Sequence, residues 1–335
     1  MFIKNSDSRT SQYNMIVVTG GAGFIGSAIV WRLNQLGNDN ILIVDELGID
    51  EKWKNLTSLK FADYMNKWEF LDKIESGIDF NIEAIIHMGA NSSTTEKDAD
   101  HLIENNYEYT KSLAQYSIKN NIRFIYASSA ATYGDGSLGF ADNEDEINLL
   151  RPLNMYGYSK QLFDLWAIRN KLMDKIAGIK YFNVYGPNEY HKEDMRSVVN
   201  KAYDQIKETG KVKLFKSENP LYKDGEQKRD FIYIKDAVEM TIYFLFNREK
   251  NGIYNVGSGK ARTWNALVKS IFNALGRPIN LDYVELPDHL KTKYQYFTEA
   301  DISKIKKAGY TQPSFSLEDG VTDYVKNYLM QNKYL

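Results

Sequence analysis

A tyrosine–lysine pair in the stretch YGYSK (156–160) is the first feature that suggests chemistry. Tyr156 and Lys160 are four residues apart, so on a helix they share a face and lie one turn from each other. Tyr158 is two residues from Lys160 and points roughly the opposite way. A phenol has a pKa of about 10, and a neighbouring ammonium lowers that pKa. The spacing predicts that Tyr156 exchanges protons with a substrate hydroxyl, although such pairs also occur on helix surfaces without function.

A glycine-rich turn near the start of the chain predicts a nucleotide cofactor. The stretch TGGAGFIG (19–26) follows an apolar run, MIVVT, and opens a predicted helix. Such glycines permit a tight turn, close approach of a pyrophosphate and close packing of helix on strand. The N-terminus of the helix also offers free N–H groups to phosphates. The predicted contacts from this turn are Gly20, Gly23 and Gly26.

The acidic residues after the second predicted strand bear on the choice of cofactor. Asp45 and Glu46 follow the run ILIV and can accept hydrogen bonds from a ribose hydroxyl, which favours NAD. Lys52 and Lys67 lie a short way downstream and can instead offset the 2′-phosphate of NADP. The sequence leaves both cofactors open.

A small-residue stretch, ASSAATYG (127–134), ends another predicted strand. Ligands bind outside the carboxyl ends of the strands in parallel sheets of this kind. Ser129 is therefore predicted to lie beside the nicotinamide and to hydrogen-bond the reacting oxygen. Together with Tyr156 and Lys160, it predicts oxidation of a carbinol, with the proton passing to the Tyr156 phenolate and the hydride to the cofactor.

The elements that must position these residues follow a regular pattern in the first half of the chain. Short β-branched runs alternate with longer stretches of helical period, which is typical of an α/β fold with a doubly wound parallel (Rossmann) sheet. After about residue 184 the pattern becomes less regular and predicts a smaller, mixed α/β part. The predicted strands are MIVVT (15–19), ILIVD (41–45), EAIIHM (83–88), RFIYAS (123–128) and IKYFNV (179–184).

The pattern divides the chain into three parts. We expect an N-terminal extension over 1–14, because that stretch is polar and lacks an apolar core of signal-peptide length. A dinucleotide-binding domain is predicted over 15–184, with a return near 231–259. A substrate domain is predicted over 185–230 and 260–335.

Composition excludes several classes of function. The chain of 335 residues has a formal net charge of −2, which gives no basic field for nucleic acid. It has no cysteine, so thiolate chemistry and disulfides are excluded. No apolar run is long enough to span a membrane, and we expect a cytoplasmic protein. No metal site is expected, because the four histidines lack ligand spacing: His87, His101, His191 and His289.

These motifs resemble those of the extended short-chain dehydrogenase/reductase family, in its NAD-dependent epimerase/dehydratase branch. Within that branch the chain is similar to the ADP-heptose 6-epimerases over nearly its whole length from Met15. The resemblance rests on the stretches NSSTTE, NNY, YASSAATYG, LNMYGYSK, YFNVYGP, HK, KRDFIYI and YQYFT.

The resemblance implies a tightly bound NADP that is recycled within one turnover. The C6″ hydroxyl of an ADP-heptose would be oxidised, the ketone would reorient, and hydride would return to the opposite face. Such an inversion requires proton exchange in two orientations of the sugar. The family pairs its tyrosine with a lysine, which is matched here by Lys192. Each well-placed acid or base contributes about 10²–10⁴-fold in rate.

The resemblance also implies binding residues. An arginine suits a diphosphate because its planar fork binds two oxygens at once. Four of these residues also have a purely structural interpretation. Phe24 and Ile25 could serve only to pack the first helix, and Phe215 and Tyr294 could be aromatic residues of the core. The implied cofactor contacts are Phe24, Ile25, Asp45, Glu46, Lys52, Lys67, Met88, Gly89, Ala90, Asn91, Ser92, Asn105, Lys160 and Val184. The implied sugar-nucleotide contacts are Asn183, Phe215, Arg229 and Tyr294, with Asp194 and Lys201 lining the pocket.

The chain departs from the family pattern at several of these positions. Glu46 stands where many members have asparagine, and its charge opposes a 2′-phosphate. Met88 replaces an acidic residue, and Asp194 and Lys201 replace serine and histidine. An insertion, NPLYKDGEQ, follows Phe215 and changes the expected shape of the nucleotide-facing loop.

Two other functions are compatible with the fold. The first is another sugar-nucleotide enzyme of the superfamily, a 4-epimerase or a 4,6-dehydratase. Dehydratases typically place an acid pair after the strand-end serine or threonine, whereas Ala130 and Ala131 follow Ser129 here. The second is a non-catalytic dinucleotide sensor, which would be expected to lose the tyrosine–lysine pair. The resemblance implies a homo-oligomer, commonly a pentamer, that serves synthesis of the lipopolysaccharide core.

Overall fold

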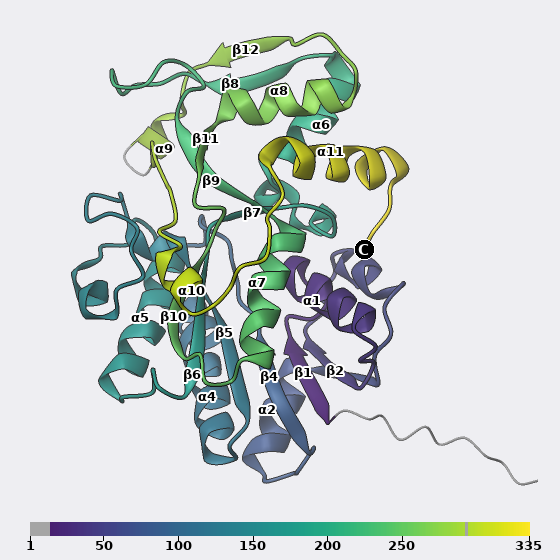
Figure 1. Ribbon diagram of the computed structural model, residues 1–335, viewed down its shortest axis with the longest axis vertical. Coiled ribbons are helices and arrows are strands. Elements are labelled where there is room, and N and C mark those ends of the chain that lie inside the picture. The colour runs from purple at the N-terminus through teal and green to yellow at the C-terminus, as the bar shows by residue number, and fades with distance from the viewer. Residues whose placement is uncertain (1–13, 292–293) are drawn as a thin grey trace, which may run out of the picture.

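The computed structural model describes residues 14–291 and 294–335, and its centre is a seven-stranded parallel sheet. The strand order is β10-β6-β5-β4-β1-β2-β3, and the order reverses between β1 and β4, where ligands bind in such sheets. The predicted doubly wound parallel fold is therefore confirmed (Figure 1). The strands are β1 (Met15–Thr19), β2 (Ile41–Asp45), β3 (Asp63–Asn66), β4 (Ile82–His87), β5 (Arg123–Ser129), β6 (Ile176–Tyr181) and β10 (Gly252–Val256).

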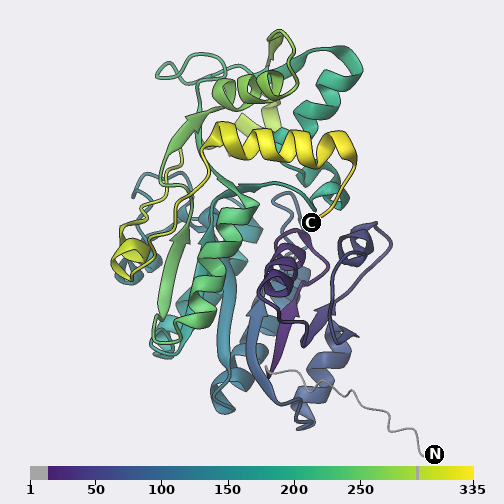
Figure 2. The same cartoon turned by 45° about the vertical axis from the view of Figure 1, so that its right-hand side comes forward.

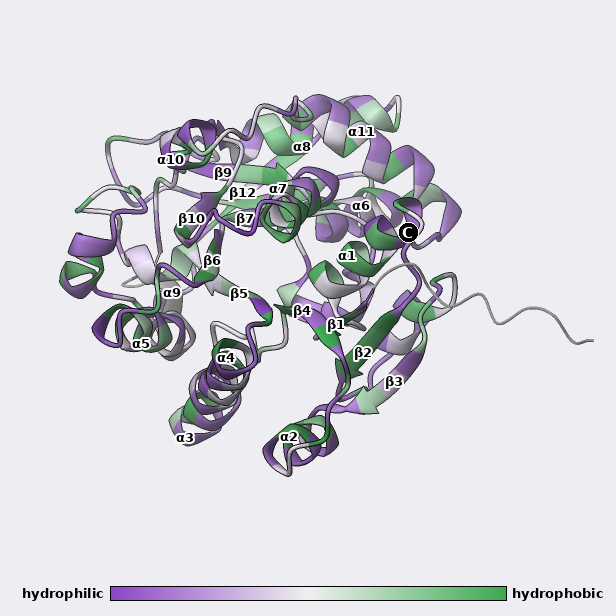
Figure 3. Cartoon of the chain, turned by 60° about the horizontal axis from the view of Figure 1, so that its bottom comes forward, coloured by the Kyte–Doolittle hydropathy of each residue, from purple (hydrophilic) through white to green (hydrophobic). Residues whose placement is uncertain are grey.

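Helices cover both faces of this sheet (Figure 3). On one face, α1 and α7 pack over a buried cluster that includes Val18 and Ile29. On the other, α2, α4 and α5 pack over a second cluster with Val17 and Leu113, because successive side chains of a strand point to opposite faces. The helices are α1 (Phe24–Gln35), α2 (Lys67–Glu75), α3 (Ala99–Leu102), α4 (Tyr109–Lys119), α5 (Met155–Arg169) and α7 (Ile234–Phe246). No helix among the described residues is long and apolar enough to cross a bilayer.

A smaller part of the molecule lies above the carboxyl ends of the parallel strands (Figures 1 and 2). It contains a three-stranded sheet, β11-β9-β7, and a parallel pair, β12 and β8. Its strands are β7 (Asn183–Tyr185), β8 (Val212–Phe215), β9 (Lys228–Tyr233), β11 (Ala261–Thr263) and β12 (Leu281–Val284). The helices that follow Tyr185, other than α7, are α6 (Val198–Thr209), α8 (Trp264–Ala274), α9 (Asp288–Lys291), α10 (Ser303–Lys307) and α11 (Leu317–Asn327).

Short helical turns connect these elements. The one that matters most for the site is η5, which leads from β7 to α6. A π-helical segment, η2 (Ile103–Glu108), leads into α4. η5 covers Tyr190–Met195, and the remaining short turns are η1 (Lys52–Leu56), η3 (Ala130–Tyr133), η4 (Glu144–Leu149) and η6 (Leu329–Gln331).

The prediction of a single strand over 179–184 is wrong. β6 begins earlier, at Ile176, and ends at Tyr181, after which the chain crosses from the large sheet to the small one. The amide of Phe182 still donates to the carbonyl of Val256 on β10, while Asn183 already pairs with Phe231 on β9. An apolar run that spans two sheets has the same composition as one long strand, so the break is not visible in the sequence.

A buried carboxylate holds α5 against the sheet. Asp164 is 0% exposed and accepts hydrogen bonds from Tyr126 and Ser128 of β5, at 2.9 and 2.7 Å. Lys180 of β6, also 0% exposed, forms an ion pair with it at 2.8 Å and donates to the hydroxyl of Thr132 at 2.6 Å. The carboxylate therefore joins one helix to two neighbouring strands.

We expect Asp164→Asn to destabilise the fold strongly, because it leaves the Lys180 ammonium buried without a countercharge. Breaking a buried pair from one side costs about 3–5 kcal/mol. The free energy of unfolding from urea titration measures this loss. Asp174→Asn is the control, since Asp174 is exposed, and surface changes stay within about 0.5 kcal/mol. Equal stability of the two variants would show that the pair does not hold the fold.

Candidate active site

A groove of about 690 Å³ lies at the switch point, between the carboxyl ends of the strands and the smaller part. It continues into a hollow of about 260 Å³ beside β2. All the residues expected to bind the cofactor line the groove, the hollow or both. They include Phe24 and Ile25, for which packing of the first helix is the alternative. The two spaces together offer the elongated site that a dinucleotide requires.

The glycine turn between β1 and α1 fits close contact with a pyrophosphate. Gly20 has φ +65°, and a Cβ on it would lie 2.6 Å from the backbone nitrogen of Gly89. A Cβ on Gly26 would overlap the carbonyl of Gly20. At Gly23 a Cβ would meet only that carbonyl, at 3.1 Å, and would otherwise project toward the groove that Gly23 lines. No side chain caps the N-terminus of α1 in the described structure, so its free N–H groups face the site.

Two ion pairs occupy the hollow beside β2. The Asp45 carboxylate accepts from the Lys52 ammonium at 3.0 Å and from the backbone nitrogen of Ala22 at 2.8 Å. Glu46 pairs with Lys67 at 2.6 Å, and this partner lowers the pKa of the Glu46 carboxyl. Both lysines expected to meet a 2′-phosphate therefore already face a carboxylate.

The tyrosine–lysine pair lies in the first turns of α5, whose N-cap Asn154 accepts from the Gly157 amide at 2.8 Å. Tyr156 and Lys160 both line the groove, as does Ser129 at the end of β5. Tyr158 is 45% exposed and does not line it. The Lys160 ammonium donates to the carbonyl of Ala127 at 2.9 Å.

The acid–base balance of this pair differs from the expectation that Lys160 lowers the pKa of Tyr156. Burial raises the pKa of the Tyr156 phenol, and only a hydrogen bond with Ser129 lowers it in part. The Lys160 ammonium contacts a backbone carbonyl instead, and burial lowers its pKa to about 8 while Asp164 opposes the shift. In the chain by itself, burial therefore dominates the acidity of the phenol, and Ser129 opposes it in part.

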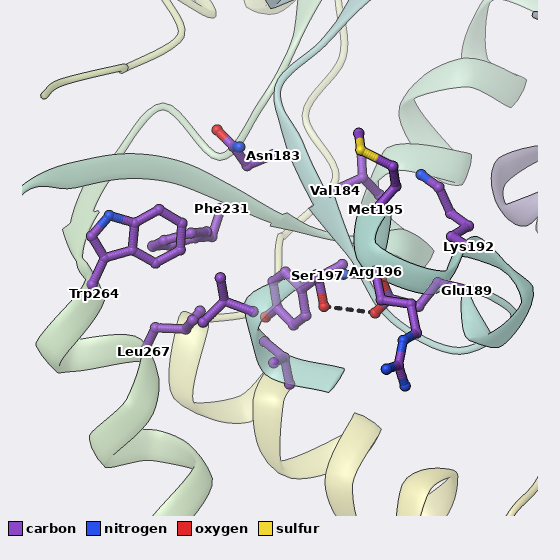
Figure 4. A pocket seen from close by; sticks show the side chains of 13 residues that line it. Asn183, Val184, Glu189, Lys192, Met195, Arg196, Ser197, Phe231, Trp264 and Leu267 are labelled. Atoms are coloured by element: carbon purple, nitrogen blue, oxygen red, sulfur yellow. Dashed lines mark hydrogen bonds between the residues drawn. The ribbon is translucent and has the colours of Figure 1, made fainter. Parts of the chain in front are cut away.

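Lys192 lines the groove from η5, a different element from the α5 helix that carries Tyr156 and Lys160. Its ammonium lies 5.5 Å from the centre of the Phe24 ring, and burial lowers its pKa while Glu189 opposes the shift. Lys192 lines both the large groove and a smaller cavity of about 200 Å³ (Figure 4).

The smaller cavity has an apolar wall and a polar wall. Phe231, Trp264 and Leu267 form the apolar side, and Lys192 and Ser197 lie opposite (Figure 4). Sequence reasoning missed Trp264, Met195 and Glu189 as lining residues, because no local motif marks them. The capping serine before α6 gives one usable signal, since Ser197 also donates to Glu189 at 2.6 Å.

The residues expected to bind the sugar nucleotide are not all brought together. Asn183 lines both the groove and the smaller cavity. Arg229 is buried with its guanidinium over the rings of Trp264 and Tyr294, at 5.7 and 5.4 Å, but it does not line these spaces. The other four also lie outside them: Asp194, Lys201, Phe215 and Tyr294.

Their surroundings explain these positions. Asp194 is exposed, and its carbonyl accepts from the Lys201 ammonium at 3.1 Å. Phe215, at the end of β8, is 36% exposed rather than a core aromatic. Within the part of the chain that the structure describes, no cluster of three or more histidine or acidic side chains is placed to hold a metal ion.

A glycine turn at the switch point, with a strand-end serine and a helical tyrosine–lysine pair, defines a nicotinamide-dependent enzyme of the short-chain dehydrogenase/reductase type. The chain belongs to the NAD dependent epimerase/dehydratase family, whose model matches residues 16–257.

Curated relatives share most of the chain. It is 54% identical over 316 residues to an ADP-L-glycero-D-manno-heptose-6-epimerase of Nitratidesulfovibrio vulgaris, covering 94% of this chain and 98% of the relative. It is 50% identical over 333 residues to the enzyme of that name from Fusobacterium nucleatum, covering 96% and 100%.

Solved structures agree with this fold. The ADP-L-glycero-D-manno-heptose-6-epimerase of Helicobacter pylori matches with a TM-score of 0.78 and 28% identity, covering 94% of this chain and 96% of that one. A UDP-glucose 4-epimerase of Thermotoga maritima, solved with UDP-glucose, also matches with a TM-score of 0.78, at 26% identity, covering 95% and 100%.

Proposed function

We propose that the chain is an ADP-L-glycero-D-manno-heptose 6-epimerase. It interconverts ADP-D-glycero-β-D-manno-heptose and ADP-L-glycero-β-D-manno-heptose by transient oxidation at C6″. The observation that carries this proposal is that Tyr156 and Lys192 line one groove from separate elements, α5 and η5. The identities of 54% and 50% to enzymes of this name support the choice of substrate.

The oxidation half of the reaction uses the α5 side of the groove. A bound nicotinamide supplies the group that accepts hydride from C6″ and later returns it. Tyr156 takes the proton of the C6″ hydroxyl in its phenolate form, and the Ser129 hydroxyl, which also hydrogen-bonds Tyr156, holds the substrate oxygen. Lys160, whose ammonium donates to the carbonyl of Ala127, would hold the nicotinamide ribose.

Inversion requires a proton-exchanging group on a second side. After the keto sugar turns, its oxygen no longer faces Tyr156, and Lys192 is then the group that exchanges the proton. Burial lowers the pKa of Lys192, so at a given pH a larger fraction of its side chain is the neutral amine than in an exposed lysine. One residue thus acts on each epimer.

The sugar-nucleotide contacts follow the family resemblance. Asn183 contacts the sugar. Its position on the lining of both the groove and the smaller cavity supports this role. The remaining proposed contacts are Asp194, Lys201, Phe215, Arg229 and Tyr294.

Glu46 sets the balance between NADP, which the resemblance implies, and NAD. Its carboxylate pairs with Lys67 at 2.6 Å, so a 2′-phosphate competes with Glu46 for that lysine. The phosphate carries about −1.5 to −2 charge and repels a nearby carboxylate. Removing the charge of Glu46 therefore favours NADP.

The biological setting also follows the resemblance. The enzyme acts in the cytoplasm as a homo-oligomer, a pentamer, and its product serves synthesis of the lipopolysaccharide core. The partner is the ADP-heptose, with no nucleic acid or membrane partner.

Incubation of the purified protein with ADP-D-glycero-β-D-manno-heptose tests the function directly. We expect NMR to show conversion at C6″ to a mixture of the two epimers, and no comparable conversion of UDP-glucose at C4″. An unchanged heptose, or equal conversion of UDP-glucose, would overturn the substrate assignment and favour a 4-epimerase.

Tyr156→Phe and Lys192→Met should each lower kcat by about 10²–10⁴-fold, because each removes one proton-exchanging group. Cofactor affinity should stay near that of the parent protein. Tyr158→Phe on the same helix and Lys207→Met on α6 are matched controls, because both positions are exposed. A Lys192→Met variant with normal kcat would exclude the two-group mechanism.

Glu46→Gln should raise affinity for NADP relative to NAD. An exposed ion pair contributes up to about 1 kcal/mol, so we expect a shift of about fivefold in the ratio of the two dissociation constants. Fluorescence titration with NADPH and NADH measures both. Glu51→Gln, on the exposed surface nearby, is the control. An unchanged ratio would remove Glu46 from cofactor selection.

A further inference from the structure

The C-terminal segment Tyr328–Leu335 lies against the loop that carries Lys192. From α11 the chain descends to the side of α1 (Figure 2). There the Tyr190 hydroxyl donates to the carbonyl of Lys333 at 2.9 Å, and the rings of Tyr190 and Tyr334 meet edge to face at 5.0 Å. Tyr190 is the first residue of η5, two positions before Lys192.

A second contact joins this segment to the base of the same loop. The backbone nitrogen of Leu335, whose residue is 7% exposed, donates to the side chain of Asn188 at 2.9 Å. The hydroxyl of Ser58 donates to the carbonyl of Leu335. Residues 328–335, here called the C-terminal latch, therefore touch the loop both before η5 and at its first residue.

Asn188 in turn ties the loop to the cofactor side of the groove. Its side chain donates to the hydroxyl of Ser27 on α1 at 2.9 Å, and its carbonyl accepts from Asn55 at 3.1 Å. The same Asn55 side chain donates to the carbonyl of Ala22 in the glycine turn at 2.9 Å. One continuous set of contacts thus runs from the latch, through Asn188 and Asn55, to the glycine turn between β1 and α1.

The backbone beside Lys192 requires such support. Glu193 has φ +46° and ψ −120°, a conformation that residues other than glycine rarely adopt. Strained residues of this kind persist only where their surroundings hold them. Ser197, which follows η5, donates at 2.6 Å to Glu189, which precedes it, and this bond ties the two ends of the loop together. Before Lys192, the contacts to Asn188 and Tyr190 come from the latch.

We propose that the C-terminal latch is a positioning element for Lys192, which it holds at the groove by fixing Asn188 and the start of η5. The inference rests on the proposed role of Lys192. No latch residue touches the groove itself, so the segment acts through the loop. A displacement of about 1 Å of a catalytic group costs about 10²-fold in rate, so a loosened loop lowers kcat.

Lysine labelling tests the positioning without relying on activity. Acetylation of the full chain by a small reagent, followed by peptide mass spectrometry, compares Lys192 with the exposed Lys207. We expect Tyr334→Ala to raise the relative labelling rate of Lys192 several-fold, because the freed loop exposes the amine. Tyr334→Phe keeps the ring and should match the parent protein, as should Met330→Ala, whose side chain is 58% exposed. An unchanged Lys192 rate in Tyr334→Ala would overturn the proposal.

A double-mutant cycle links the latch to catalysis. Tyr334→Ala should lower kcat for the heptose about tenfold or more, with the affinity for the cofactor unchanged, and should have no further effect in a Lys192→Met background. Equal losses in both backgrounds would mean that the latch does not act through Lys192. Tyr190→Phe, which removes only the hydroxyl, serves if Tyr334→Ala fails to fold. A parent protein that leaves the heptose unchanged would contradict the epimerase proposal itself, and this outcome is distinct from any effect of the latch variants.

Discussion

The site depends on the fully buried carboxylate of Asp164. It lies one turn beyond Lys160 on α5. It accepts hydrogen bonds from Tyr126 and Ser128, which lie on β5 shortly before Ser129. Its ion pair with Lys180 extends the same constraint to β6. Because helix and strands meet at this one group, the phenol, the ammonium and the strand-end hydroxyl keep a fixed geometry that neither element supplies alone.

The second half of the site has a different origin. Lys192 lies on a short helical turn with one strained residue, and its position comes from contacts that converge from α1, α6 and the C-terminal segment. The groove therefore has one wall built into the sheet and another assembled from loops. That contrast suits the proposed reaction, in which the sugar turns between two proton-exchanging groups.

The sequence predicts features that depend on local spacing. The glycine turn and the shared face of Tyr156 and Lys160 follow from residues within a few turns of each other, and the parallel sheet follows from the alternation of short strands and helices. Features that depend on distant partners do not follow from it. The crossing at Phe182, the carboxylate partner of Lys67, and the wall formed by Trp264 each need contacts between segments far apart in the chain. The pKa of Tyr156 belongs with these, because burial outweighs its neighbours.

The most direct test of the central claim follows a deuterium atom placed at C6″ of the ADP-heptose. If the groove oxidises that carbon and returns the same hydride to the opposite face, the epimerised product formed in ordinary water retains the deuterium at C6″. If the product instead carries hydrogen from water at C6″, inversion proceeds by removal of a proton from carbon. That result would contradict the roles assigned to the cofactor groove, Tyr156 and Lys192.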